Sequence, residues 1–200
     1  MKTMLPKIKF KYSYIYDHNW QTWFRVYKKT PQKLSPEKVR NYIRRIEKFW
    51  KKYEKIIPQE ILKVTGLKWT KKEIICYVVS DCRPFSDPLT LPVYKNKNYF
   101  IDVLTHELIH QIFTQDNFKK TEKVWKYFHK RYKKESFVTR IHIPLHAIHW
   151  QIYEKIFSEE RLKRDIKWSS RFPDYKKAWD IVKKEGHDKI IREFVARVKK

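Results

Sequence analysis

The sequence reads H-E-x-x-H from His106 to His110, with Glu107 as its second residue. No Pro or Gly occurs between Lys95 and Thr121, and apolar residues around the motif recur at helical spacing, so this stretch is predicted to form a helix. Residues four apart lie on one face of a helix, so the two imidazoles point to the same side. Such a pair can bind one Zn²⁺ while Glu107 reaches toward a metal-bound water.

With this motif the chain resembles the zincin metallopeptidases, which share an H-E-x-x-H helix, and the resemblance extends over about residues 73 to 157. It implies zinc-dependent hydrolysis of peptide bonds, in which His106 and His110 bind the metal and Glu107 is the general base. It also implies an α+β, zincin-like fold, in which a small mixed or antiparallel sheet places an edge strand over the H-E-x-x-H helix. The implied cofactor is Zn²⁺, and the implied partner is a peptide or protein substrate.

A catalytic zinc usually has three protein ligands and one open position, so a third ligand is expected downstream of the motif. The candidates are His142, His146, His149 and Glu154. In the helix predicted to begin after Pro144, His146 and His149 lie in the apolar arc, whereas Glu154 lies in the polar arc. We therefore favour His146, at the start of this helix, as the third ligand.

Other residues remain open candidates for the site. His149 is the second choice for the third ligand, and with Tyr153 and Arg140 it is also a candidate to stabilise an oxyanion. His142 is expected at the end of a strand, from which it reaches the metal only with a suitable orientation. Cys82 is an upstream alternative, because a Cys with H-E-x-x-H resembles the ligand set of peptide deformylases, although the glycine-rich and Glu-Gly-Cys segments of that family are absent.

Asp102 lies one helical turn before His106. Its carboxylate can orient a ligand imidazole by accepting a hydrogen bond from the ring. It can equally face solvent near the start of the helix, where an acid is favourable, and the sequence leaves both interpretations open.

Hydrophobic periodicity predicts a chain of mixed strands and helices. Pro92 favours an edge strand just before the motif helix, because Pro cannot donate a backbone hydrogen bond. The expected division is a metallopeptidase domain over residues 1–157 and a C-terminal helical extension over residues 158–200 that packs on it. Strands are predicted at residues 7–16, 73–79, 89–94 and 137–143, and a loop at 80–88. Helices are predicted at residues 36–53 and 58–65, through the motif to about residue 114, and at 121–133, 145–157, from 159 onward, 174–184 and 188–198.

The composition is strongly basic, with a formal net charge of +25. This charge favours non-specific association with nucleic acid or another acidic partner. Lys outnumbers Arg by about three to one and is spread along the chain, so the basic face of the helix from residue 36 is interpreted as a solvated face. The alternative function is a basic nucleic-acid-binding protein with a structural or absent metal site, and a third is a metal sensor or inactive peptidase.

Cysteine usage and hydropathy place further limits on the chain. Cys76 and Cys82 are separated by five residues, so they do not form a C-x-x-C pair. No apolar run approaches the length that spans a bilayer. These features predict a cytoplasmic protein without a membrane partner.

Overall fold

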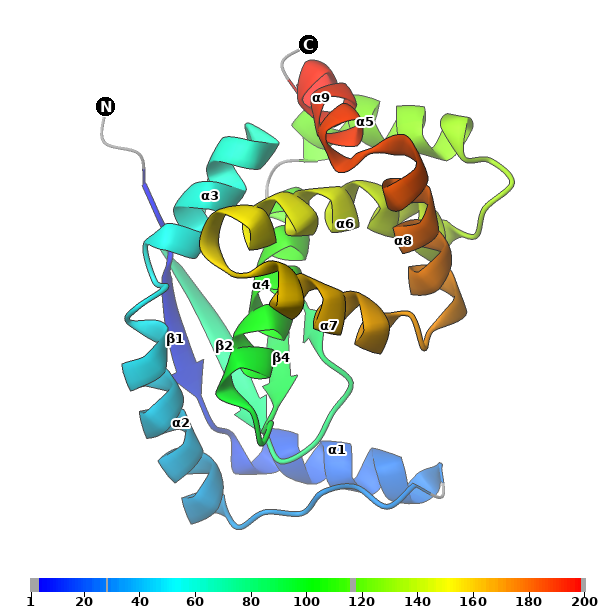
Figure 1. The fold of residues 1–200 in the computed structure, drawn as a ribbon. Helices are drawn as coiled ribbons and strands as arrows, with labels where there is room; N and C mark the ends of the chain where they lie inside the picture. Colours follow the sequence, from blue (N-terminus) through cyan, green and yellow to red (C-terminus); the bar gives the residue numbers. More distant parts are fainter. Residues whose placement is uncertain (1–3, 28, 116–117, 199–200) are drawn as a thin grey trace. The chain divides into compact units, whose positions relative to one another are not determined.

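The structure, a computed structural model, describes residues 4–27, 29–115 and 118–198. Within these residues it has nine α-helices and one four-stranded mixed sheet, so the predicted α+β class is confirmed, with helix predominant (Figure 1). The elements in chain order are β1 (Lys7–Lys11), α1 (Tyr14–Val26), α2 (Pro36–Trp50), α3 (Ile56–Thr65), β2 (Glu73–Val79), β3 (Phe85–Ser86), β4 (Leu89–Pro92), α4 (Lys97–Thr114), α5 (Phe118–Arg131), α6 (Phe137–Ile156), α7 (Glu159–Ser169), α8 (Pro173–Glu185) and α9 (His187–Val198).

The chain divides into two compact units. Unit 1 comprises Met1–Ile56 and Lys71–Gln111, and unit 2 comprises Ile57–Thr70 and Ile112–Lys200. Unit 1 therefore contains the sheet with α1, α2 and most of α4, whereas unit 2 contains the helices from α5 onward together with nearly all of α3. The division expected near residue 158 falls inside unit 2. None of the helices in the described ranges is both long and apolar enough to cross a membrane.

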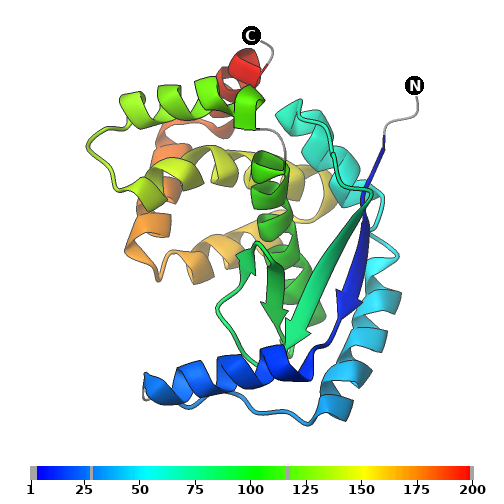
Figure 2. The same cartoon turned by 180° about the vertical axis from the view of Figure 1, so that it is seen from behind.

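The sheet of unit 1 has the strand order β1-β2-β4-β3. β1 and β4 both run parallel to β2, whereas β3 pairs antiparallel with β4 over two residues. Figure 2 shows the sheet with β1 at one edge. The prediction that residues 89–94 form the edge strand is wrong, because the short strand β3, inside the predicted loop, covers the outer side of β4. Pro92 stands at the last position of β4, where a missing donor costs little.

One face of the sheet packs against α2 and α4. Phe10 of β1 contacts the Trp50 ring of α2 edge-on, at 6.4 Å between centroids, and the Phe100 ring of α4 at 5.9 Å. The helix predicted from residue 36 does begin there, because the Ser35 hydroxyl accepts a hydrogen bond from the Lys38 amide. The motif helix is therefore held over the sheet by aromatic packing near its first turn.

The strand predicted over residues 7–16 ends at Lys11, and α1 begins at Tyr14. The reason is a helix cap that the alternation of tyrosines conceals: the Ser13 hydroxyl accepts a hydrogen bond from the Tyr16 amide. In the first turn of α1, the buried Asp17 carboxylate accepts hydrogen bonds from the amide of Ser80, at 2.9 Å, and from its hydroxyl, at 2.7 Å. Asp17 thus connects α1 to the end of β2.

We expect Asp17→Ala to lower the free energy of unfolding by about 3 kcal/mol, because it leaves two buried donors of Ser80 without their acceptor. Asp17→Asn is the matched control, since its amide oxygen retains one acceptor, and it should lose about half as much. Urea unfolding followed by circular dichroism measures both changes. A loss below about 1 kcal/mol for the alanine variant would contradict this role.

Unit 2 is organised around α6, which packs against α5, α7, α8 and α9 (Figure 1). Its core is aromatic, with Trp179, Tyr153, Phe128 and Phe194 almost completely buried. At the surface, Arg131 of α5 forms ion pairs with Glu193 of α9 and with Glu185 at the end of α8. These contacts fix α6 within its unit.

The prediction of a strand over residues 137–143 is wrong, because these residues form the first two turns of α6. The β-branched sequence favours a strand locally, but Ser136 caps a helix by accepting a hydrogen bond from the Thr139 amide. Pro144 does not begin this helix but lies inside it. Packing of α6 against four other helices overrides the local preference. As a consequence His142, expected on a strand, lies on a helix.

Candidate metal centre

The H-E-x-x-H motif lies on α4, as predicted, and its two histidines differ in exposure from their neighbours. Every residue between Phe100 and Phe113 is buried except His106 and His110, which are half-buried. The two imidazole rings lie with their centroids 5.1 Å apart and their planes at 69°. This follows from the helical spacing of four residues, which brings successive turns of one face together. Within a largely apolar helix, the two imidazoles are the residues that solvent reaches.

Glu107, between the two histidines, is buried. Burial raises the pKa of its carboxyl from 4.5 to about 8. A carboxyl with a pKa near neutrality is suited to accept and release a proton during a reaction. A nearby divalent cation favours the ionised form of a carboxyl group. A bound metal would therefore raise the fraction of Glu107 that is ionised and able to accept a proton.

Asp102 is completely buried, so the interpretation that it faces solvent is wrong. It stands four residues before His106 and eight before His110, which places all three on one stripe of α4. A buried carboxylate one turn from a ligand imidazole is a common means of fixing the orientation of the ring and raising its basicity. Its position therefore agrees with a supporting role for His106.

The residue that follows the motif connects α4 to the edge of the sheet. The side-chain amide of Gln111 donates a hydrogen bond to the carbonyl oxygen of Ser86 in β3. Gln111 is buried, so this bond lies in a protected environment. The edge strand β3 is thereby fixed to the residue that follows the second histidine of the motif.

In unit 2, α6 carries a second set of histidines. His142, His146 and His149 are all buried and follow one another at spacings of four and three residues, so they share one face of the helix with Tyr153. Nδ1 of His142 lies 2.7 Å from the carbonyl oxygen of Val138, which can only accept a hydrogen bond. Nδ1 therefore carries the hydrogen, and Nε2 carries the lone pair that a metal ion requires.

The protonation state of His142 also suits a ligand. Burial lowers the pKa of its imidazole from 6.5 to about 4, so the ring is neutral at pH 7. Only a neutral imidazole can bind a metal ion. The hydrogen bond from Nδ1 to a backbone carbonyl is the arrangement that usually holds a metal-binding histidine in place.

Three histidines have ligand atoms close enough to share one metal ion. One ring nitrogen from each of His106, His110 and His142 lies within 4.8 Å of the other two. These three residues could hold a metal ion. The group contains both histidines of the motif, as the sequence predicts, but its third member is His142 and not the favoured His146.

The structure places His146 against an aromatic ring. Its imidazole stacks on the indole of Trp179, with ring centroids 4.0 Å apart and planes at 9°, and it meets the Tyr175 ring edge-on at 5.7 Å. His146 is not a member of the three-histidine group. These two ring contacts pack α6 against α8.

His149 and Tyr153, predicted to stabilise an oxyanion, lie together on α6 with ring centroids 4.7 Å apart. Both side chains are completely or almost completely buried. Nδ1 of His149 is 3.9 Å from a carboxylate oxygen of Asp165, which is too long for a hydrogen bond. Burial lowers the pKa of His149 to about 3, so it is a neutral imidazole with one N–H donor.

Two other candidate ligands are less suited to a metal. Glu154 is exposed, as its polar arc predicts, and its carboxylate accepts a hydrogen bond from the Trp150 indole at 2.9 Å and lies 3.2 Å from Nε2 of His187. Cys82 is buried, and burial raises the pKa of its thiol, which opposes the thiolate form that binds metals. Neither residue belongs to the three-histidine group.

Comparisons of this chain with protein-family models, with curated proteins and with solved structures give no match.

Proposed function

We propose that this protein is a zinc metallopeptidase, in which His106, His110 and His142 bind Zn²⁺ and Glu107 is the general base. The observation that supports this proposal is the group of three histidine nitrogens within 4.8 Å of one another, centred on an H-E-x-x-H helix. The buried Glu107 stands between two of these ligands in the sequence, where a structural metal site would not need a carboxylate.

The chemistry of the three residues fits zinc. Zn²⁺ is commonly held by imidazole nitrogens, and three protein ligands leave a fourth position for water or substrate, as catalytic sites require. The tautomer of His142 is fixed by its hydrogen bond to Val138, so its Nε2 is ready to bind without rearrangement of the proton. The half-buried positions of His106 and His110 leave the site accessible to water and substrate.

Bound Zn²⁺ would polarise the carbonyl of the scissile bond and lower the pKa of a water molecule toward neutrality. Glu107 takes the proton from the attacking water and later delivers it to the nitrogen of the leaving amine. Asp102, one turn before His106, would orient that imidazole, which makes it a positioning residue. Neutral His149 and Tyr153 are the proposed donors to the oxyanion that forms as water adds to the carbonyl.

The zincin resemblance also suggests how a peptide would bind. In that architecture the substrate backbone adds to the edge of the sheet next to the metal helix. The edge strand at the β4 side of the sheet is β3, which Gln111 connects to α4 by its hydrogen bond to Ser86. We therefore propose β3, in place of residues 89–94, as the strand against which an extended peptide aligns.

A mixture of internally quenched fluorogenic peptides tests the proposed activity. We expect hydrolysis by the zinc-loaded protein, its loss on treatment with a zinc chelator, and its return when Zn²⁺ is added back. His106→Ala, purified in the same way, should be inactive and controls for a contaminating peptidase. Hydrolysis that persists after complete removal of zinc would contradict the proposal.

A further inference from the structure

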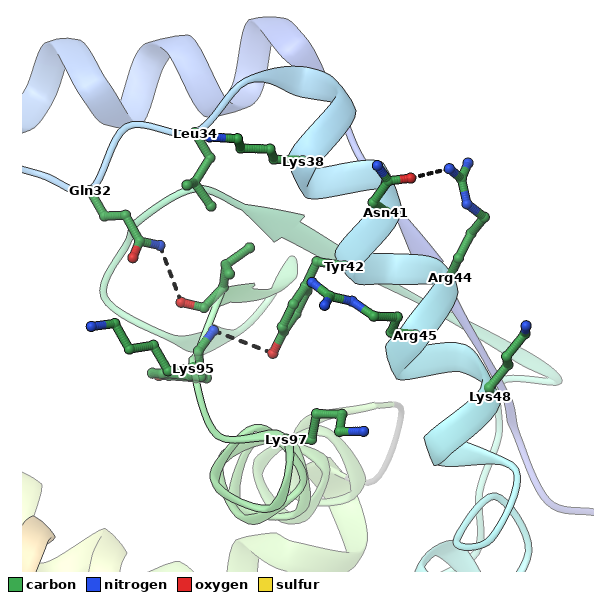
Figure 3. A pocket seen from close by; sticks show the side chains of 12 residues that line it. Gln32, Leu34, Lys38, Asn41, Tyr42, Arg44, Arg45, Lys48, Lys95 and Lys97 are labelled. Carbon is green, nitrogen blue, oxygen red and sulfur yellow. Dashed lines mark hydrogen bonds between the residues drawn. The ribbon is translucent and has the colours of Figure 1, made fainter.

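Unit 1 contains a basic groove that is formed independently of the metal centre. The groove has a volume of about 780 Å³ and lies between α2 and the connection from β4 to α4 (Figure 3). Six of its twelve lining residues are cations and none is an acid. Four cations come from α2 and two from residues 95–97: Lys38, Arg44, Arg45, Lys48, Lys95 and Lys97.

The six cations are exposed, and in the described part of the chain none of them forms an ion pair with a carboxylate. Elsewhere on this protein exposed lysines do pair with acids, as Lys126 does with Glu122 at 2.6 Å. Like charges gathered in a concave surface repel one another and create a strong positive potential. Binding of a polyanion in such a potential is favourable, because the cations of the protein replace counterions held around the polyanion and release them.

The floor of the groove adds uncharged hydrogen-bonding groups. The Tyr42 hydroxyl accepts a hydrogen bond from the backbone amide of Tyr94 at 3.3 Å, and its own hydrogen is a donor. Burial raises the pKa of Tyr42, so the phenol keeps this hydrogen at neutral pH. The side-chain amide of Gln32 donates hydrogen bonds to the carbonyl oxygens of Ser80, at 3.0 Å, and of Val93, at 3.4 Å.

We propose that this groove binds the phosphodiester backbone of a single-stranded nucleic acid. A single phosphate carries at most two charges, so six cations on two walls fit an extended polyanion better than a small anion. A concave surface fits a strand better than the flat surface of a bilayer. Its volume is that of a cleft for a small ligand, which favours a narrow single strand over the wide cylinder of a duplex. A positive groove of this kind tracks a single strand without reading its sequence.

The test measures binding of a fluorescein-labelled DNA strand of about 20 thymidines by anisotropy, between about 50 and 200 mM KCl. The groove variant Arg45→Gln/Lys95→Gln/Lys97→Gln removes cations from both walls. The matched control Lys130→Gln/Lys133→Gln/Lys134→Gln removes three exposed lysines of unit 2, so both variants have the same net charge. All of these side chains are exposed, so folding should be retained, and circular dichroism checks this.

We expect the groove variant to bind about tenfold more weakly than the unaltered protein at the lowest salt, with a slope of log affinity against log salt that is shallower by about 2. The control variant should keep the original slope to within about 0.5, because its lysines contact no phosphate. Equal losses in the two variants, or no detectable binding by the unaltered protein, would overturn the proposal.

Competition identifies the class of ligand, and His106→Ala separates binding from catalysis. Unlabelled single strands should displace the probe better than the same sequence as a duplex, and better than poly-glutamate or inorganic polyphosphate of equal charge. Stronger displacement by the duplex, the acidic peptide or polyphosphate would overturn the assignment to single strands. Binding should persist in His106→Ala, so failure of the groove and failure of the peptidase proposal are observed separately.

Discussion

Glu107→Gln is expected to lower kcat for peptide hydrolysis by about 10³-fold while zinc remains bound. The amide of Gln has nearly the shape of the carboxyl group but cannot accept the proton of the attacking water. The metal ligands are unchanged, so zinc content should stay at about one ion per chain. Steady-state hydrolysis of a fluorogenic peptide and elemental analysis of the same sample provide the two measurements.

The fold should tolerate this change. Burial raises the pKa of Glu107 to about 8 in the folded protein, whereas its ordinary value is 4.5. A carboxyl shifted in this direction destabilises the metal-free fold progressively as the pH rises from about 4.5 to about 8, and Gln lacks this effect. The metal-free variant should therefore melt at the same temperature as the parent near pH 4 and at a higher temperature near pH 8. Retained hydrolysis by the folded, zinc-loaded variant would rule out Glu107 as the base.

His142→Phe is expected to weaken zinc binding at least about 100-fold, because it removes one of three proposed ligands. Phe keeps an aromatic ring against Tyr175, which lies 4.2 Å from the His142 ring, so packing is disturbed little. Competition with a fluorescent zinc chelator measures the affinity. Hydrolysis should fall with zinc content, and excess Zn²⁺ should restore it in part.

His146→Phe is the matched control on the same helix. It preserves an aromatic ring stacked on Trp179, and this slightly larger ring has no nitrogen that could bind a metal. We expect this variant to bind zinc with the affinity of the parent protein. The opposite result, with zinc lost in His146→Phe and kept in His142→Phe, would contradict the proposed ligand set and support the choice that the sequence favours.

The starts of two helices, at residues 36 and 159, and the motif itself were the features most readily predicted from the sequence. Ser35 before Pro36 and Ser158 before two glutamates both cap helices in the structure, because their hydroxyls accept amides of the first turn. The helix carrying His106, Glu107 and His110 was also predicted, with its end at Thr114. In these segments the local signal and the tertiary structure agree.

The assignment of residues 137–143 failed because local and tertiary preferences disagree there. Val138, Thr139 and Ile141 favour a strand, but packing of α6 against its neighbours stabilises a helix. This one error concealed the alignment of His142 with His146 and His149 on a single helical face. The signal that could have revealed it is the spacing of four and three residues, together with Ser136 as a cap.

The basic groove could not be recognised from charge patterning alone. The basic face of α2 has the pattern of an ordinary solvated helix. Lys95 and Lys97 are separated from it by about fifty residues in the sequence, and only the position of β4 and α4 beside α2 brings the two sets together (Figure 3). A groove built from segments distant in the sequence leaves no local pattern.

Anomalous diffraction at the zinc edge from crystals of the zinc-loaded protein would test the proposed metal centre most directly. We predict one zinc ion at about 2.0–2.1 Å from a nitrogen of His106, of His110 and of His142, with Nε2 as the ligand atom of His142. Glu107 should lie near the fourth, open position. Zinc bound away from α4 would contradict the proposed metal centre. So would a zinc ion whose third ligand is His146, His149, Glu154 or Cys82 in place of His142.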